Sequence, residues 1–198
     1  RGVWQHHQHV SYCFFGSKKH LMENIFQSRR MPFYQFGEML HLKCIPTEYW
    51  VPFICSRFEK YGKKISEEYA ARICHTVKNY SSYVQQLAWD VMAETDKEVN
   101  EESFTEGFNA LLEQNSSLFI QQTEGLTTYQ LNFIRLLCKG IHSAFNTQSV
   151  ADLYPLGSKS NVDRIKKSLI AKEIITIERE GIYLADCVFE LWFKREMM

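Results

Sequence analysis

The spacing of apolar side chains most constrains this fold, because from Thr47 onward it mostly follows the period of an α-helix. Four amphipathic helices are predicted between residues 47 and 123. Thr47 and Ser66 can cap the first two, since each hydroxyl can accept from free backbone N–H groups of a first helical turn. The polar residues 79–82 can cap the third, and the fourth begins near Asn100. Short polar turns separate the four helices, so this part of the chain predicts a small helical bundle.

Two of these helices carry well-defined apolar stripes. We expect the first helix to bury one face and to end at Gly62. The apolar stripe predicted for the first helix is Trp50, Phe53, Ile54, Phe58 and Tyr61. The stripe predicted for the fourth helix is Phe104, Phe108, Leu111, Leu112, Leu118 and Phe119.

The beginning of the chain has a different pattern. Residues 10–15 form a nearly uncharged, aromatic and β-branched run that favours a strand buried on both faces, and residues 39–45 alternate like a second strand. Between them lies an amphipathic helix that Ser17 can cap and that ends on Arg29 and Arg30. Since an unpaired strand exposes its backbone, we expect the two strands to pair or to exchange with a second chain.

The last third of the chain predicts helix, helix, helix and hairpin, which is the order of a winged helix-turn-helix domain. Residues 161–172 would be the helix that enters a DNA major groove. Residues 174–179 and 182–185 would form the hairpin, and Asp186 would cap a closing helix.

Local charge makes DNA one candidate partner of this region, because residues 156–179 contain six basic and three acidic side chains, a modest excess. The candidate DNA-binding residues are Lys159, Ser160, Asn161, Arg164, Lys167 and Arg179. The alternative is a protein-docking module with an ordinary charged helix face. By contrast, residues 94–124 hold eight carboxylates and one lysine, so that segment should not lie against DNA.

The amino-acid composition excludes several classes of partner and binding site. Lys plus Arg equals Asp plus Glu at 23 each, so the chain as a whole has no bulk attraction to nucleic acid or to an anionic membrane. No apolar run is long enough to cross a bilayer, and no signal-peptide pattern opens the sequence. The six cysteines are scattered, which favours reduced thiols in the cytoplasm, and no histidine cluster has metal-ligand spacing. We therefore expect a cytoplasmic protein with no membrane partner and no metal site.

The usual catalytic motifs are absent. The sequence contains no GxxxxGK[ST], GxGxxG, HExxH or GxSxG. We therefore expect no catalysis and no cofactor from this chain alone.

Four segments together resemble one family: HHQHVSYCFFGSKKHLMENIF, PFYQFGEMLHL, YVQQLAWDV, and the final stretch from LTTYQLNFIRLLCKGI to LADCVFELWF. Their order and spacing are similar to the carboxyl-terminal half of archaeal-type AAA+/STAND P-loop ATPases. The resemblance implies a mainly α fold with a small β component. It implies a remnant of an α/β ATPase core at residues 1–46, a helical lid bundle at 47–123 and a winged helix at 124–198.

The resemblance also implies roles for individual residues. Ser17 matches the sensor-1 position that contacts the γ-phosphate or the attacking water, and Arg29 or Arg30 matches an arginine finger. Asn79 and Tyr83 match the lid turn that approaches adenine, although this turn lacks the family's frequent His-Pro pair. Walker A and Walker B are both absent, so ATP and Mg²⁺ are expected only for a longer parent protein.

The sequence therefore predicts a fragment of an AAA+/STAND ATPase that couples nucleotide state to a DNA or protein partner and is not catalytic by itself. The parent would be an ATP hydrolase, and a homo-oligomer is compatible with an arginine finger. Two alternatives remain open. One is a free-standing winged-helix DNA-binding regulator with a helical dimerisation bundle, and the other is a protein-interaction scaffold.

Overall fold

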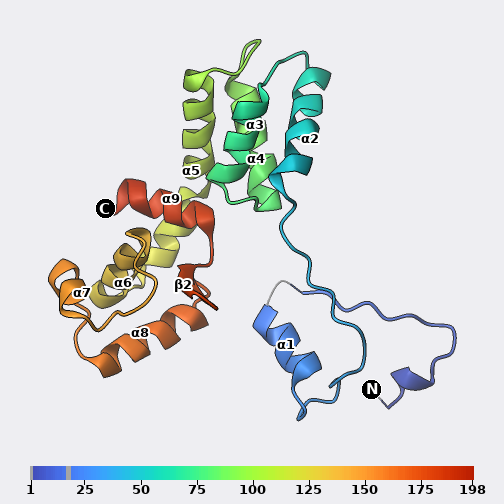
Figure 1. Ribbon diagram of the computed structural model, residues 1–198, viewed down its shortest axis with the longest axis vertical. Coiled ribbons are helices and arrows are strands. Elements are labelled where there is room, and N and C mark those ends of the chain that lie inside the picture. The colour runs from blue at the N-terminus through green and yellow to red at the C-terminus, as the bar shows by residue number, and fades with distance from the viewer. Residues whose placement is uncertain (1, 17–18) are drawn as a thin grey trace. The chain divides into compact units, whose positions relative to one another are not determined.

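The computed structural model describes residues 2–16 and 19–198, and the chain divides into two compact units, residues 1–43 and 44–198 (Figure 1). The first unit contains a short 3₁₀ helix, Trp4–His6, and α1, Lys19–Gln27. The second begins with α2 (Thr47–Lys60), α3 (Glu67–Thr76), α4 (Ser81–Glu94) and α5 (Glu101–Glu124). It continues with α6 (Thr128–Cys138), α7 (Gln148–Leu153), α8 (Lys159–Ala171), β1 (Ile175–Glu178), β2 (Gly181–Leu184) and α9 (Cys187–Glu196). The predicted fold class, mainly α with a small β component, is confirmed.

The prediction of two strands near the beginning of the chain is wrong. Residues 10–15 and 39–45 have no regular structure, and neither segment pairs with another within the described residues. A strand is stable only where a neighbour satisfies its backbone and another layer buries its side chains. Here Phe15 is 93% exposed and Leu42 is 89% exposed, so both requirements fail. Within residues 2–16 and 19–198 the two segments do not pair with each other, and their exchange with a second chain stays a prediction.

Aromatic rings hold the first unit together instead. The Trp4 ring stacks on Tyr12 and Phe14, with ring centroids 5.1 and 5.5 Å apart. Phe33 lies 5.3 Å from Trp4 and 5.9 Å from Phe26 of α1. Among residues 2–4, 6–16 and 21–43, whose exposure is described, none is buried. These rings contact one another without building a closed core.

Two predicted helix starts in the second unit need correction. α8 begins at Lys159, after its cap residue Ser158, and not at residue 161. The Ser66 hydroxyl accepts from the Tyr69 N–H at 3.2 Å, and Asn100 and Ser103 cap α5 reciprocally. Thr47 is not the cap residue of α2, because α2 already includes it and Pro46 precedes it without a side-chain bond. The Thr47 hydroxyl instead donates to the Asn79 side-chain oxygen at 3.1 Å.

The buried faces match the predicted stripes in part. Trp50, Ile54 and Phe58 of α2 are buried, as expected. Phe53 is 41% exposed and Tyr61 is 57% exposed, because α2 packs along the i, i+4 row of the first three residues and leaves the other two on its open side. In α5 the stripe is buried at Phe104, Leu111, Leu112 and Phe119, whereas Leu118 is 49% exposed.

A close approach of two helix backbones lies at Gly107 of α5. A Cβ atom at this position would be 2.5 Å from the backbone nitrogen of Val91 and 2.6 Å from its Cα, in α4. Such distances are far inside van der Waals contact, so only glycine allows the two helix backbones to approach this closely. The spacing of α4 and α5 therefore depends on the missing side chain.

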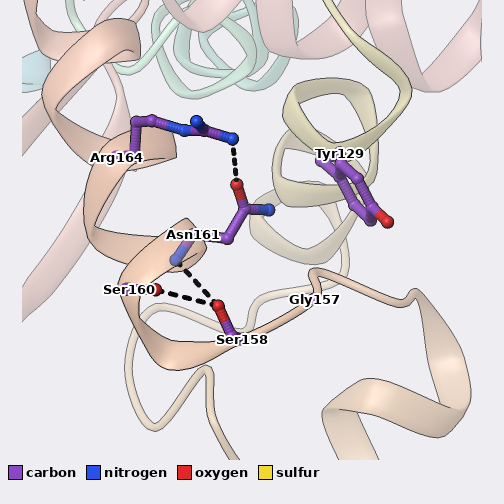
Figure 2. Close-up of a pocket in the computed structure, with 6 residues that line it drawn as sticks. All are labelled: Tyr129, Gly157, Ser158, Ser160, Asn161 and Arg164. Atoms are coloured by element: carbon purple, nitrogen blue, oxygen red, sulfur yellow. Dashed lines mark hydrogen bonds between the residues drawn. The ribbon is translucent and has the colours of Figure 1, made fainter.

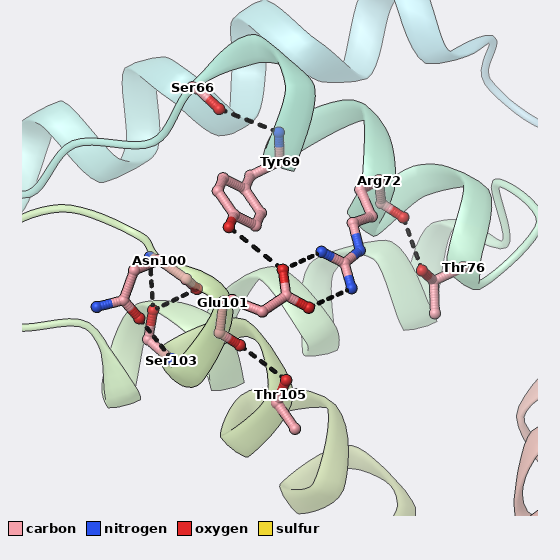
Figure 3. Close-up of polar contacts among 8 residues, drawn as sticks. All are labelled: Ser66, Tyr69, Arg72, Thr76, Asn100, Glu101, Ser103 and Thr105. Atoms are coloured by element: carbon pink, nitrogen blue, oxygen red, sulfur yellow. Dashed lines mark hydrogen bonds and ion pairs between the residues drawn. The ribbon is translucent and has the colours of Figure 1, made fainter.

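A surface ion pair joins α3 to the start of α5 (Figure 3). The Arg72 guanidinium donates to both carboxylate oxygens of Glu101, at 2.5 and 2.8 Å, and lies 4.1 Å from the Phe104 ring centroid. The Tyr69 hydroxyl donates to the same carboxylate at 3.3 Å. The hydrogen bonds from Arg72 lower the pKa of Glu101, which fits a carboxylate held charged at a helix N-terminus.

The last part of the chain has the predicted order of three helices, a hairpin and a closing helix. β1 and β2 are antiparallel, and a Cβ on Gly181, whose φ is +153°, would lie 2.7 Å from the His142 carbonyl oxygen. That carbonyl accepts from the Ile182 N–H at 3.0 Å, so the segment at His142 lies against β2 as an outer neighbour. Asp186 caps α9 as expected, accepting from the N–H groups of Val188 and Phe189.

The core is continuous from the helical bundle into this last part. Phe119 of α5 contacts Phe189 of α9, with ring centroids 5.4 Å apart. The Trp192 indole N–H donates to the Ser116 hydroxyl at 3.1 Å. α5 therefore packs against α4 with one part of its length and against α9 with another.

Replacing Gly107 with alanine should destabilise the chain by about 1–3 kcal/mol, because the added methyl group forces α4 away from α5 and outweighs the better helix propensity of alanine. Thermal unfolding followed by circular dichroism would measure the loss. Ser117→Ala, at an exposed position of the same helix, is the matched control and should change little. Equal melting temperatures for Gly107→Ala and the unsubstituted chain would contradict the close approach.

Candidate functional site

A polar pocket of about 520 Å³ lies at the N-terminus of α8 (Figure 2). It is lined by Tyr129, Gly157, Ser158, Ser160, Asn161 and Arg164. Ser158 is the cap residue, and its hydroxyl accepts from the Asn161 N–H at 3.4 Å and lies 2.9 Å from the Ser160 hydroxyl. Tyr129 comes from α6, so the pocket lies between two helices.

The pocket combines three groups that favour an anionic oxygen. The free N–H groups at the start of α8 carry partial positive charge, the serine hydroxyls can donate, and the guanidinium of Arg164 is cationic. These donors match the needs of a phosphate or a carboxylate. The chemistry available here is therefore binding of an anion, without a nucleophile and base arranged for a reaction.

The exposed face of α8 carries three predicted DNA-binding residues. Ser160, Arg164 and Lys167 are all exposed and recur at the spacing of one helix face, which also carries Asp163. Val162, Ile165 and Leu169 on the other side are buried. The hydrophobic core therefore orients this face toward solvent.

Asn161 has a different environment from the one its predicted role suggests. Its side-chain amide donates to the Leu156 carbonyl at 2.6 Å, and its oxygen accepts from the Arg164 guanidinium at 2.8 Å. Asn161 thus holds the loop before α8 and orients Arg164. Contact between Asn161 and a base stays a prediction that would require these bonds to be exchanged.

The other predicted basic residues lie outside the pocket. Lys159 and Lys167 are exposed on α8, and Arg179 is exposed in the turn between β1 and β2. Within residues 2–16 and 19–198, no ion pair joins Lys159, Lys167 or Arg179 to a carboxylate. Their charges are therefore available to a partner.

Sequence reasoning did not assign Tyr129, Gly157 or Ser158 to a site. Ser158 carried a local signal as a possible helix cap, and Gly157 precedes it. Tyr129 carried none, because it is about thirty residues away from the other pocket residues and reaches them only through the packing of α6 beside α8.

The two residues expected near adenine have partners within the chain. Asn79 has a positive φ of 59° and accepts from Thr47 as described above. The Tyr83 hydroxyl donates to the second carboxylate oxygen of Asp186 at 2.5 Å, across the boundary predicted between lid and winged helix. Burial and this hydrogen bond both raise the pKa of Tyr83. An adenine contact stays a prediction for both residues.

Two further contacts, close to the Tyr83–Asp186 bond, also connect the predicted lid to the predicted winged helix. The Lys78 ammonium is 2.7 Å from a Glu190 carboxylate oxygen, and the Cys187 thiol donates to the Val77 carbonyl at 3.3 Å. Three contacts therefore connect the turn between α3 and α4, together with the first turn of α4, to the start of α9.

The sensor and finger candidates lie in the first unit. Ser17 lies outside the described residues. Arg29 and Arg30 are exposed in the turn that follows α1. Their predicted contact with a neighbouring subunit's nucleotide stays a prediction.

Among residues 2–16 and 19–198, no group of three or more His, Cys, Asp or Glu side chains could hold a metal ion. No helix in that same part combines the length and apolar character needed to span a bilayer.

The fold is similar to a solved structure, a Walker-type ATPase of Pyrococcus abyssi, with a TM-score of 0.64 and 14% sequence identity. The similarity covers 88% of this chain and 50% of that ATPase, so the chain spans about half its length. No family model matches the chain. No curated protein matches it either. The likeness shows that this chain has a fold found in part of an archaeal Walker-type ATPase.

Tyr83→Phe should lower stability by about 1–3 kcal/mol, because Asp186 loses a donor in a partly buried setting. Tyr80→Phe, at the residue that precedes α4, is the matched control and should cost less. The difference in the free energy of unfolding between Tyr83→Phe and the unsubstituted chain should have its full size below about pH 10. Since the folded-state pKa of Tyr83 is raised, the difference should shrink at higher pH as the tyrosine ionises. Denaturant unfolding across this range would measure it, and a pH-independent difference would contradict the bond.

Proposed function

We propose that this chain is the lid and winged-helix half of an AAA+/STAND-type ATPase, and that it couples the nucleotide state of the parent enzyme to a DNA or protein partner. The observation that supports this most is the likeness of nearly the whole chain to half of a Walker-type ATPase. In this proposal residues 1–46 derive from the α/β core, 47–123 are the lid and 124–198 are the winged helix.

The contacts around Tyr83 explain how such coupling would work. A lid that moves with bound nucleotide carries α4 and the turn before it. Tyr83 of α4 bonds to Asp186 of the proposed winged helix, and Lys78 of the turn bonds to Glu190. Because α5 also packs against α9, movement of the lid would displace the winged helix as well.

The catalytic groups of the parent would come mainly from outside these 198 residues. Walker A and Walker B are absent from the sequence, so ATP and Mg²⁺ would be bound by other parts of the parent. Ser17 is the proposed sensor. Arg29 and Arg30 are the proposed arginine fingers, which would act on a neighbouring subunit in a homo-oligomer.

An ATPase assay on the longer protein tests this proposal. We expect the reading frame upstream of Arg1 to encode GxxxxGK[ST] and the full protein to hydrolyse ATP. Replacing both Arg29 and Arg30 with alanine should lower kcat by about a thousandfold. Arg72→Ala, which removes an arginine from a surface ion pair, should leave kcat unchanged. Absence of the upstream motif would refute the ATPase assignment.

For the partner, we favour DNA bound through α8 and the hairpin. Ser160, Arg164 and Lys167 form an exposed face, and the pocket at the start of α8 has donors suited to a backbone phosphate. Arg179 in the hairpin turn would reach a neighbouring phosphate. The two alternative functions, a free-standing DNA-binding regulator and a protein-interaction scaffold, differ from each other in this contact.

Titration of the chain with a fluorescent duplex at several salt concentrations would test DNA binding. We expect a Kd of about 10⁻⁴–10⁻⁶ M for mixed-sequence DNA at physiological salt, weakening as salt rises. Replacing Arg164 and Lys167 with alanine should reduce the slope of log K against log salt by about two. Lys60→Ala on α2 should leave the slope unchanged. No affinity even at low salt would exclude DNA and favour the scaffold.

A further inference from the structure

An apolar groove of about 290 Å³ lies between α2 and α4. These two helices lie away from α8 (Figure 1). Its walls include Phe53, Arg57 and Tyr61 on the α2 side and Gln85, Trp89 and Met92 on the α4 side. The Tyr61 and Trp89 rings meet edge to face, with centroids 6.1 Å apart. All of these residues belong to the second compact unit.

Three aromatic rings at this groove are exposed to solvent, whereas Trp50 and Phe58, which also line it, are buried. Trp89 and Tyr61 are each 57% exposed, and Phe53 is 41% exposed. The buried rows of α2 and α4 are already complete, with Trp50, Ile54 and Phe58 on one helix and Val84, Leu87 and Val91 on the other. Gathered exposed aromatic rings are typical of a surface that binds another protein.

The charge of the residues that line the groove indicates which kind of partner would bind there. Arg57 is the one charged residue of the groove lining, and its guanidinium lies 4.9 Å from the Phe53 ring centroid. No ion pair joins Arg57 to a carboxylate within the part of the chain that the structure describes. A cation over an aromatic ring at the side of an apolar groove is complementary to an apolar segment that carries an acidic side chain.

We propose that this groove binds an amphipathic, acidic helix of a partner protein. One or two large apolar side chains of the partner would fill the groove between Phe53 and Trp89, and an Asp or Glu about one turn away would pair with Arg57. The volume suits side chains of that size and is small for a nucleotide or a drug-sized cofactor. The inference goes beyond the proposed ATPase function, because it requires neither nucleotide nor DNA.

Binding of a designed peptide to the full chain tests this proposal. The probe is a fluorescein-labelled helical peptide of about five turns, with Leu and Phe at i, i+3, i+4 and i+7 and Glu residues beside that stripe. A second peptide has Lys in place of each Glu. Fluorescence anisotropy should show that the acidic peptide binds about tenfold more tightly than the basic peptide.

Three substitutions locate the binding. Trp89→Ala should weaken the acidic peptide by about tenfold or more, and Phe53→Ala provides a second probe of the groove if the first variant is poorly folded. Arg57→Glu should reverse the preference between the two peptides. Lys60→Glu makes the same charge change on the same helix outside the groove lining, and it should alter Kd by about twofold at most. Circular dichroism would verify that each variant is folded.

Several results would overturn the proposal. These are no binding of the acidic peptide, equal binding of both peptides, or equal effects of Arg57→Glu and Lys60→Glu. A dimer in sedimentation that dissociates in Trp89→Ala would also overturn it, since a second copy of the chain would then cover the groove. ATP hydrolysis by the longer protein does not enter this test, so the two proposals fail independently.

Discussion

The close approach of α4 and α5 at Gly107 is the constraint on which the second unit depends. α5 has 24 residues, and it extends from the capped start at Asn100 past the contact with Val91 to the rings of α9. A shift of α5 away from α4 would therefore also move Ser116 and Phe119, which pack against α9. One helix sets the geometry of the bundle and of the last part of the chain together.

The contacts around Tyr83 give the second link between these parts. Asp186 caps α9 with one carboxylate oxygen and accepts from Tyr83 with the other, so the same side chain defines a helix start and an interface. Lys78 and Asn79 both adopt positive φ without being glycine, which is an uncommon backbone conformation. Their side chains bond to Glu190 and Thr47, and those bonds help to hold the turn in this form.

The two candidate surfaces differ in how well a sequence can reveal them. Ser160, Asn161 and Arg164 are neighbours on one short helix, so their grouping at the pocket follows from local spacing. Tyr129 joins them only because α6 packs beside α8. In the groove, Phe53 and Tyr61 have the helical spacing of core residues and were predicted to be buried. Spacing alone does not distinguish a core face from an open one, because only the neighbouring helix decides which row it covers.

The sequence by itself determined the helices from residue 47 onward and most of their ends. Those features depend on local interactions: apolar period, capping side chains such as Ser66 and Asn100, and turn residues. It also determined the order of helices and hairpin in the last third. Tertiary structure alone decided that residues 10–15 and 39–45 are not strands, that α4 and α5 meet at Gly107, and that Tyr83 bonds to Asp186. Each of these depends on partners distant in the chain, because a strand needs a neighbour, a close approach needs two backbones, and a hydrogen bond needs its acceptor.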